Sequence, residues 1–173
     1  MRGVQERGTV PALSGAAEAE PARRRAWRRG LVAAATLAAV VGFDQLTKTL
    51  AERRLARGPI DLLGPIRLAL TYNTGAAFGL GKGSAPVLVA GGVVVVVFVV
   101  RSARRSDSTA AVVATSLVVG GAAGNLVDRL IRHNAGAVID FVDLRIWPVF
   151  NLADACVVCG AALLVIALRR ASP

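Results

Sequence analysis

Two polar residues three positions apart, Asn151 and Asp154, open the last apolar run of the chain. Residues with this spacing share a helix face, so the carboxamide and the carboxylate should point in the same direction. The segment that follows, 155–168, has the composition of a membrane-buried helix. An ionisable group in or near hydrocarbon is costly, which makes Asp154 a candidate functional residue.

The chemistry that this position favours is hydrolysis by two carboxylates that share one proton. The ionised member takes a proton from water while the protonated member polarises the scissile carbonyl. Mutual repulsion and partial desolvation keep one of the two protonated near neutral pH. The chain has one histidine, His133, and no HExxH motif, and Cys156 and Cys159 read as small buried hydrophobes. We therefore predict no metal and no cofactor.

Three aspartates compete to be the partner of Asp154. Asp128 precedes Arg129 and follows Asn125 by three residues, so an ion pair or helix-end hydrogen bonds explain it. Asp140 lies among apolar residues with no adjacent cation, which favours it modestly over Asp143.

The composition indicates a membrane protein. Of the 173 residues, 54% are hydrophobic and 18% charged, too apolar for an ordinary soluble domain of this length. The net charge of +10 lies in short basic clusters between apolar blocks, and few aromatic residues are present for base stacking, so nucleic-acid binding is not expected. We predict an all-α polytopic membrane protein after a flexible basic tail. The predicted tail covers 1–30, and the predicted transmembrane helices cover about 31–50, 85–100, 109–127 and 150–168.

Polar groups also lie at the end of the first span and in the segment that follows it. Asp44 and Lys48 are four apart and can pair on one helix face, as a simple ion pair or to orient a substrate. Segment 66–72 alternates like a short strand, and segment 73–79 is a turn of small residues.

The third span ends in small residues, and a loop follows it. Gly120 and Gly124 are four apart, a spacing that favours close helix packing. We expect the loop, 130–148, to carry Asp140 to the site, and Trp147 suits the aromatic belt of a membrane interface.

Charge predicts the topology, because four spans place both termini on one side. Basic clusters at 23–29, 101–105 and 169–170 directly flank span ends, which places both termini in the cytoplasm. The candidate polar residues then converge on the outer face.

Five short motifs in this order resemble those of the bacterial lipoprotein signal peptidases, also called type II signal peptidases. The motifs are Asp44–Lys48, Asn73–Phe78, Gly124–Arg129, Val138–Phe141 and Phe150–Asp154. The resemblance covers about 30–170; the long N-terminal tail and a slightly longer 129–140 loop depart from it without touching a motif.

The resemblance implies a four-helix membrane aspartic peptidase with a small extracytoplasmic β-subdomain. Such an enzyme, a monomer in the bacterial inner membrane among phospholipids, cleaves lipid-modified prolipoproteins just before the diacylglyceryl cysteine. The catalytic residues would be Asp140 and Asp154, with Asp128 structural. The positions implied to line the site or bind substrate are Asp44, Lys48, Asn73, Gly75, Asn125, Arg129 and Asn151.

Two other function classes remain at this point. A small transporter could use Asp44 and Asp154 as relay residues, but it needs charges near the membrane midplane, whereas these lie toward span ends. A non-enzymatic scaffold with glycine-rich faces leaves the outer aspartates unexplained.

Overall fold

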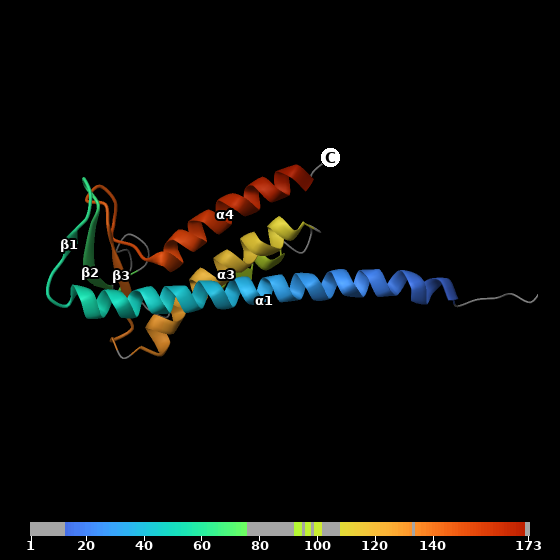
Figure 1. Cartoon of the computed structure of the whole chain (residues 1–173), viewed down its shortest axis with the longest axis horizontal. Helices are drawn as coiled ribbons and strands as arrows, with labels where there is room; N and C mark the ends of the chain where they lie inside the picture. The colour runs from blue at the N-terminus through green and yellow to red at the C-terminus, as the bar shows by residue number, and fades with distance from the viewer. Residues whose placement is uncertain are drawn as a thin grey trace, which may run out of the picture.

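The computed structural model describes residues 13–75, 92–94, 96–97, 99–101, 108–132 and 134–171. Helices lie side by side, and a small sheet covers one end of them (Figure 1). In chain order the elements are α1 (Leu13–Leu55), β1 (Ile60–Asp61), β2 (Arg67–Asn73), α3 (Thr109–Leu130), β3 (Val138–Asp143) and α4 (Leu152–Ala171).

Three of the described helices are long and apolar enough to cross a membrane: Arg23–Leu55, Thr109–Leu130 and Leu152–Arg170. This confirms a membrane protein with a small sheet. The predicted span at about 85–100 lies mostly outside the described residues, and those described within it, 92–94, 96–97 and 99–100, are helical. Four spans therefore stay a prediction.

Helix α1 begins much earlier than the sequence indicated. It starts at Leu13, so the described part of the expected flexible tail, 13–30, is helical. Alanine, glutamate and arginine, which dominate this segment, have high helix propensity. Arg24 also bonds Glu20 one turn earlier, at 2.6 Å. Apolar periodicity was the wrong signal for this segment, because its helix is not amphipathic.

Helix α3 packs against both other long helices through glycines. A side chain at Gly120 would lie 2.9 Å from Cβ of Val40 in α1, and one at Gly160 of α4 would lie 2.8 Å from the carbonyl oxygen of Ala114 in α3. The close approach predicted for Gly120 and Gly124 is confirmed. The sequence did not predict the role of Gly160 on α4, because its neighbours in sequence are ordinary apolar residues.

The three strands form an antiparallel sheet in the order β1-β2-β3. Strand β2 confirms the prediction for 66–72. The prediction of a loop throughout 130–148 is wrong, because residues 138–143 form β3 and pair with β2, placing Asp140 opposite Thr71. Four of the six residues in β3 are valine, isoleucine or phenylalanine, which favour strands. The buried aspartates interrupt the alternation by which the sequence would reveal it.

Substituting Gly160 by alanine should loosen the contact between α3 and α4. The added methyl group would meet a backbone oxygen that cannot move aside, so we expect a loss of about 1–3 kcal/mol in unfolding free energy. Gly42→Ala is the matched control, because nothing lies within 4 Å of its added methyl group. It should gain about 0.5–1 kcal/mol from helix propensity. Thermal unfolding in detergent compares the two; equal unfolding temperatures would contradict the packing role of Gly160.

Candidate active site

Asn151 and Asp154 form a reciprocal cap at the start of α4. The backbone N–H of Asp154 donates to Oδ1 of Asn151 at 2.9 Å, and the backbone N–H of Asn151 donates to Oδ2 of Asp154 at 3.3 Å. This arrangement satisfies N–H groups that a helix start leaves unpaired. The sequence predicted that the two side chains share a helix face; Asn151 instead precedes the helix, and the two residues meet through its cap.

Asp140 on β3 is 2% exposed and lies between two carboxamides. Nδ2 of Asn73 donates to its Oδ2 at 3.0 Å, and Nδ2 of Asn151 donates to its Oδ1 at 2.7 Å. Burial raises the pKa of Asp140 to about 6, and the nearby charge of Asp154 adds to the rise, against the N–H donors of Asn73 and Asn151, which lower it. Asp140 is therefore a carboxyl group that can hold a proton near neutral pH.

Asn125 on α3 joins this arrangement to Asp154. Its Nδ2 donates to Oδ1 of Asp154 at 2.9 Å, and its Oδ1 accepts from Nδ2 of Asn151 at 3.0 Å. The two aspartates are thus linked through two carboxamides, Asn151 and Asn125, whose side chains come from different parts of the chain. The arrangement brings together five of the residues predicted for the site: Asn73, Asn125, Asp140, Asn151 and Asp154.

Lys48 lies beneath these carboxamides with its ammonium fully buried. The ammonium pairs with Oδ2 of Asp44 and Oδ2 of Asp128, both at 2.8 Å, and donates to Oδ1 of Asn125 at 2.9 Å. Three acceptors match the three N–H bonds of an ammonium group. The predicted pairing of Asp44 with Lys48 is confirmed, and the structural interpretation of Asp128 agrees with an ion pair, although its partner is Lys48.

Each carboxylate that pairs with Lys48 also holds the backbone directly before a candidate catalytic residue. Oδ1 of Asp44 accepts from the backbone N–H of Ala153 at 3.0 Å, immediately before Asp154. Oδ2 of Asp128 accepts from the backbone N–H of Ile139 at 3.0 Å, immediately before Asp140. Lys48, Asp44, Asp128 and Asn125, which we call the Lys48 cluster, therefore connect α1 and α3 to both aspartates.

Two further polar residues, Gln45 and Arg132, enclose the Lys48 cluster and were not predicted. Nε2 of Gln45 donates to Oδ1 of Asp128 at 3.0 Å and lies 3.1 Å from Oδ2 of Asp44. Nε of Arg132 donates to Oε1 of Gln45 at 3.0 Å. Sequence signals were available for both: Gln45 is adjacent to Asp44, and Arg132 lies four residues after Asp128, with which it pairs at 3.6 Å.

Arg129 and Gly75 tie the loops beside the aspartates together. The guanidinium of Arg129 donates to the carbonyl oxygen of Gly75 at 2.6 Å and to that of Gly136 at 3.2 Å. The backbone N–H of Gly75 donates in turn to Oδ1 of Asn73 at 2.9 Å. Arg129 thereby fixes the end of the strand from which Asn73 reaches Asp140.

Asp143, the competitor of Asp140 in the sequence, belongs to a separate ion pair. Its Oδ2 accepts from the guanidinium of Arg67 at 2.7 Å, and its Oδ1 accepts from the backbone N–H of Arg145. The hydrogen bond from Arg145, followed by that from Arg67, lowers the pKa of Asp143. Such a carboxylate is ionised at neutral pH and is not a proton donor.

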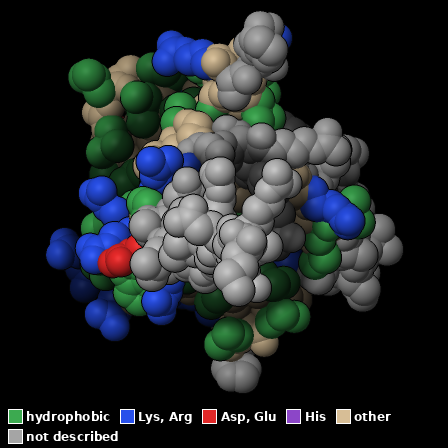
Figure 2. Space-filling view, turned by 90° about the vertical axis from the view of Figure 1, so that its right-hand side faces the viewer, with side chains coloured by type: hydrophobic (Ala, Val, Ile, Leu, Met, Phe, Trp, Pro, Cys, Tyr) green, Lys and Arg blue, Asp and Glu red, His purple; other side chains and the backbone are tan. Residues whose placement is uncertain are grey.

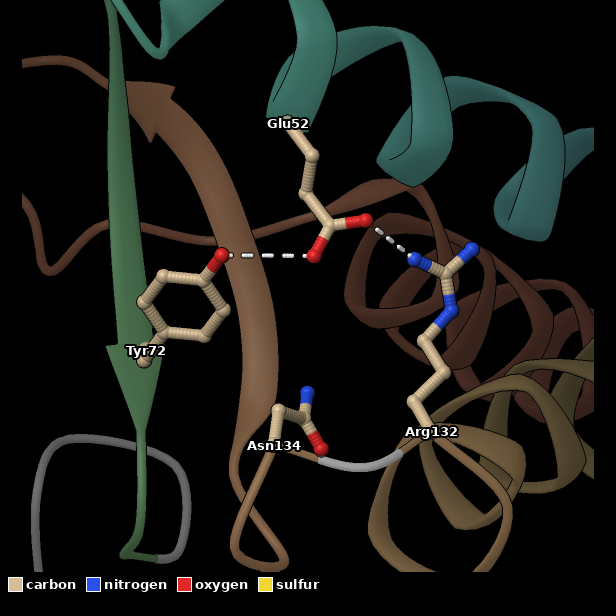
Figure 3. A pocket seen from close by; sticks show the side chains of 4 residues that line it. All are labelled: Glu52, Tyr72, Arg132 and Asn134. Carbon is tan, nitrogen blue, oxygen red and sulfur yellow. Dashed lines mark hydrogen bonds and ion pairs between the residues drawn. The ribbon is translucent and has the colours of Figure 1, made fainter.

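A pocket of about 580 Å³ lies near the end of α1, lined by Glu52, Tyr72, Arg132 and Asn134. Figure 3 shows the Tyr72 hydroxyl and the Arg132 guanidinium on either side of the Glu52 carboxylate, at 3.2 and 2.6 Å. Among the residues that the structure describes, none forms a hydrogen bond with the buried carboxamide of Asn134. Nε of Arg132 also lies 3.6 Å from Oδ1 of Asp128, so this pocket borders the Lys48 cluster.

Comparison with known proteins identifies close similarities. The sequence pattern of the family described as Signal peptidase (SPase) II matches residues 36–170. A lipoprotein signal peptidase of Rhodococcus jostii is 42% identical over 158 residues, covering 88% of this chain and 78% of that protein. A lipoprotein signal peptidase of Pelotomaculum thermopropionicum is 41% identical over 140 residues, covering 79% and 90%. A bacterial membrane enzyme solved by the in meso method superposes with a TM-score of 0.67 and 28% identity, covering 79% and 91%.

Replacing Lys48 by methionine should destabilise the protein strongly. The change leaves the fully buried carboxylates of Asp44 and Asp128 without their ammonium, and loss of one partner from a buried ion pair costs about 3–5 kcal/mol. Arg54→Met is the matched control, since Arg54 is an exposed cation on the same helix and should change stability by less than about 0.5 kcal/mol. Chemical unfolding in mixed micelles measures both; similar values would show that Lys48 does not fasten the site.

Proposed function

The chain belongs to the signal peptidase II family, aspartic peptidases that remove signal peptides from prolipoproteins, and we propose that Asp140 and Asp154 are its catalytic pair. The observation that carries this proposal is the bridge between them: Asn151 donates to Asp140 at 2.7 Å and caps the same helix turn as Asp154. Asp140 and Asp154 are also the aspartates that the family resemblance implies.

In the proposed mechanism the two aspartates begin in different protonation states. Asp140, whose pKa is about 6 because of burial, holds the proton. Asp154 acts as the ionised base, and its carboxylate accepts N–H bonds from Asn125 and from the backbone of Asn151.

The reaction proceeds in two steps. Asp154 takes a proton from water as the water oxygen attacks the scissile carbonyl carbon, and Asp140 gives its proton to the carbonyl oxygen, which forms a tetrahedral diol. The diol then collapses: the C–N bond breaks, one carboxyl group protonates the leaving nitrogen, and the other recovers the diol proton. The products are the carboxyl end of the signal peptide and a free amino group on the lipid-modified cysteine.

We assign positioning roles to the residues around the pair. Lys48 and Asp44 are fully buried, which favours support of the site over the direct substrate contact expected from the sequence. Asp128, which is also buried and pairs with the same ammonium, has the same supporting role. Asn73, Asn125 and Asn151 orient the two carboxyl groups by hydrogen bonds. Arg129 and Gly75 remain proposed substrate contacts, because they lie at the end of β2 beside Asn73, which bonds Asp140.

The proposed location is the inner membrane of a bacterium, with both termini in the cytoplasm and the aspartates at the outer face. Helix α1 begins and α4 ends at the same end of the molecule, opposite the sheet (Figure 1). Figure 2 views that end and shows Lys and Arg side chains with little acidic surface. The exposed arginines there include Arg23, Arg24, Arg25, Arg28, Arg169 and Arg170. Such an excess of basic residues beside span ends is typical of the cytoplasmic side.

The proposed substrate is a prolipoprotein that carries a diacylglyceryl cysteine, cleaved just before that cysteine while it lies among phospholipids. We further propose that the enzyme works as a monomer, because the catalytic residues and their supports all come from one chain. No residue of a second copy is needed to complete the hydrogen bonds described for the aspartate pair.

Replacing either catalytic aspartate by asparagine should abolish cleavage and leave substrate binding intact. Asparagine keeps an acceptor for the cap or the strand contacts but cannot exchange a proton, so we expect a rate loss of at least about 100-fold. Asp143→Asn is the control and should retain most activity. Release of signal peptide from a purified diacylated prolipoprotein measures the rate, and full activity in Asp140→Asn or Asp154→Asn would overturn the assignment.

Activity should fall as the pH rises past about 6, because Asp140 must hold a proton and its pKa is raised to about 6. The N–H donor of Asn73 stabilises the ionised carboxylate and so lowers this pKa. Asn73→Ala should therefore raise it and move the high-pH decline of kcat/KM to higher pH. A pH profile in detergent micelles tests this; a shift to lower pH would show that Asp140 is not the proton donor.

A further inference from the structure

One end of the sheet carries a group of strongly exposed apolar side chains. The turn between β1 and β2 contributes Leu62 and Leu63, 56% and 83% exposed, and the segment after β3 contributes Ile146 and Trp147, 86% and 55% exposed. We call these four residues the apolar tip. Isolated exposed hydrophobes need no explanation, but a contiguous group of large ones marks an interaction surface.

The two segments of the apolar tip are fastened to each other just below it. The guanidinium of Arg145 bonds Oδ1 of Asp61 at 2.6 Å, and Arg67 bonds Asp143 at 2.7 Å. Arg145 adopts φ 63°, a left-handed turn that the side chain of Asp143 stabilises by accepting from its backbone N–H. The charged groups next to the tip are therefore paired with one another, whereas the four apolar side chains of the tip remain largely exposed.

We propose that the apolar tip inserts into the membrane interface and anchors the sheet on the lipid surface. Trp147 precedes the first residue of α4, a candidate membrane span, by only five residues, so the chain keeps it within about 18 Å of that span end. Tryptophan and leucine beside paired charges suit the boundary between headgroups and acyl chains. The ion pair between Asp61 and Arg145 should hold Leu62 and Leu63 at about the same depth in the membrane interface as Trp147.

The anchor would hold the sheet, and with it Asp140 on β3, at a constant height above the bilayer that carries the substrate's lipid. This inference rests on the membrane location of the chain and not on the assignment of Asp140 and Asp154. Its failure would leave the catalytic proposal untouched, and loss of activity in the aspartate variants would not affect it.

Fluorescence of Trp147 tests the proposal directly, since the chain has only two tryptophans. The full-length Trp27→Phe protein, reconstituted in phosphatidylglycerol–phosphatidylcholine vesicles, leaves Trp147 as the sole reporter. We expect its emission to be quenched by lipids brominated on the upper acyl chain and protected from iodide in the water. Quenching by iodide without quenching by brominated lipid would overturn the proposal. Protection from both that disappears when the protein is diluted in lipid would overturn it in favour of a second copy.

Two variants in the Trp27→Phe background test whether the apolar tip itself inserts into the lipid. Leu63→Asp combined with Ile146→Asp should expose Trp147 to iodide and weaken quenching by brominated lipid, because a carboxylate resists removal from water. Ile131→Asp is the matched control: Ile131 is 66% exposed, but it is the residue after α3 and belongs to neither segment of the tip, so this substitution should leave the fluorescence of Trp147 unchanged. Cleavage of a detergent-solubilised prolipoprotein confirms that each variant is folded. Unchanged quenching in the tip variant would contradict insertion.

Discussion

The fully buried ammonium of Lys48 is the interaction on which the site depends. Removing an ammonium from water is expensive, and the cost is recovered only when all its N–H bonds meet good acceptors. Asp44, Asp128 and Asn125 meet that need. The two carboxylates also hold the backbone of other elements, Asp44 through its second oxygen and Asp128 through the same oxygen that pairs with Lys48. A local electrostatic requirement thus fixes the relative positions of α1, α3, the sheet and the start of α4. The same requirement makes the site intolerant of small displacements.

The buried charge of the Lys48 cluster depends on the close packing of the helices around it. A methyl group at Gly124 would lie 2.5 Å from Oδ2 of Asp44, so the carboxylate reaches its place only because α3 has no side chain there. A carboxylate held so closely between helices has no room for water and must be satisfied by protein groups. The glycines of α3 therefore set the geometry of the polar cluster as well as the distance between helices.

Local signals in the sequence predicted those features that depend on neighbouring residues. The spacing of Asp44 and Lys48 indicated a real ion pair, and that of Asn151 and Asp154 indicated that both belong to one site. Apolar length located α3 and α4. Contacts between distant residues left no such signal: Lys48 meets Asn125, 77 positions away. Asp140 was expected on a loop because its strand is short and interrupted by buried carboxylates. The early start of α1 was missed because its helix is stabilised by propensity and not by an apolar face.

The same kind of hydrogen bond, from a backbone N–H to a buried carboxylate, holds the chain before Asp140 on a strand and before Asp154 on a helix. Each follows directly a residue whose backbone N–H is held by a carboxylate of the Lys48 cluster, Ile139 on a strand and Ala153 in the first turn of a helix. Each bond fixes the peptide plane that leads into Ile139 or Ala153 and thereby positions the backbone one residue ahead of the aspartate. The carboxyl groups are then brought to one place by two rigid elements, which hold a geometry better than loops do. Asp154 is in addition part of the cap of its helix, so the proposed catalytic base is positioned by the same bonds that begin α4.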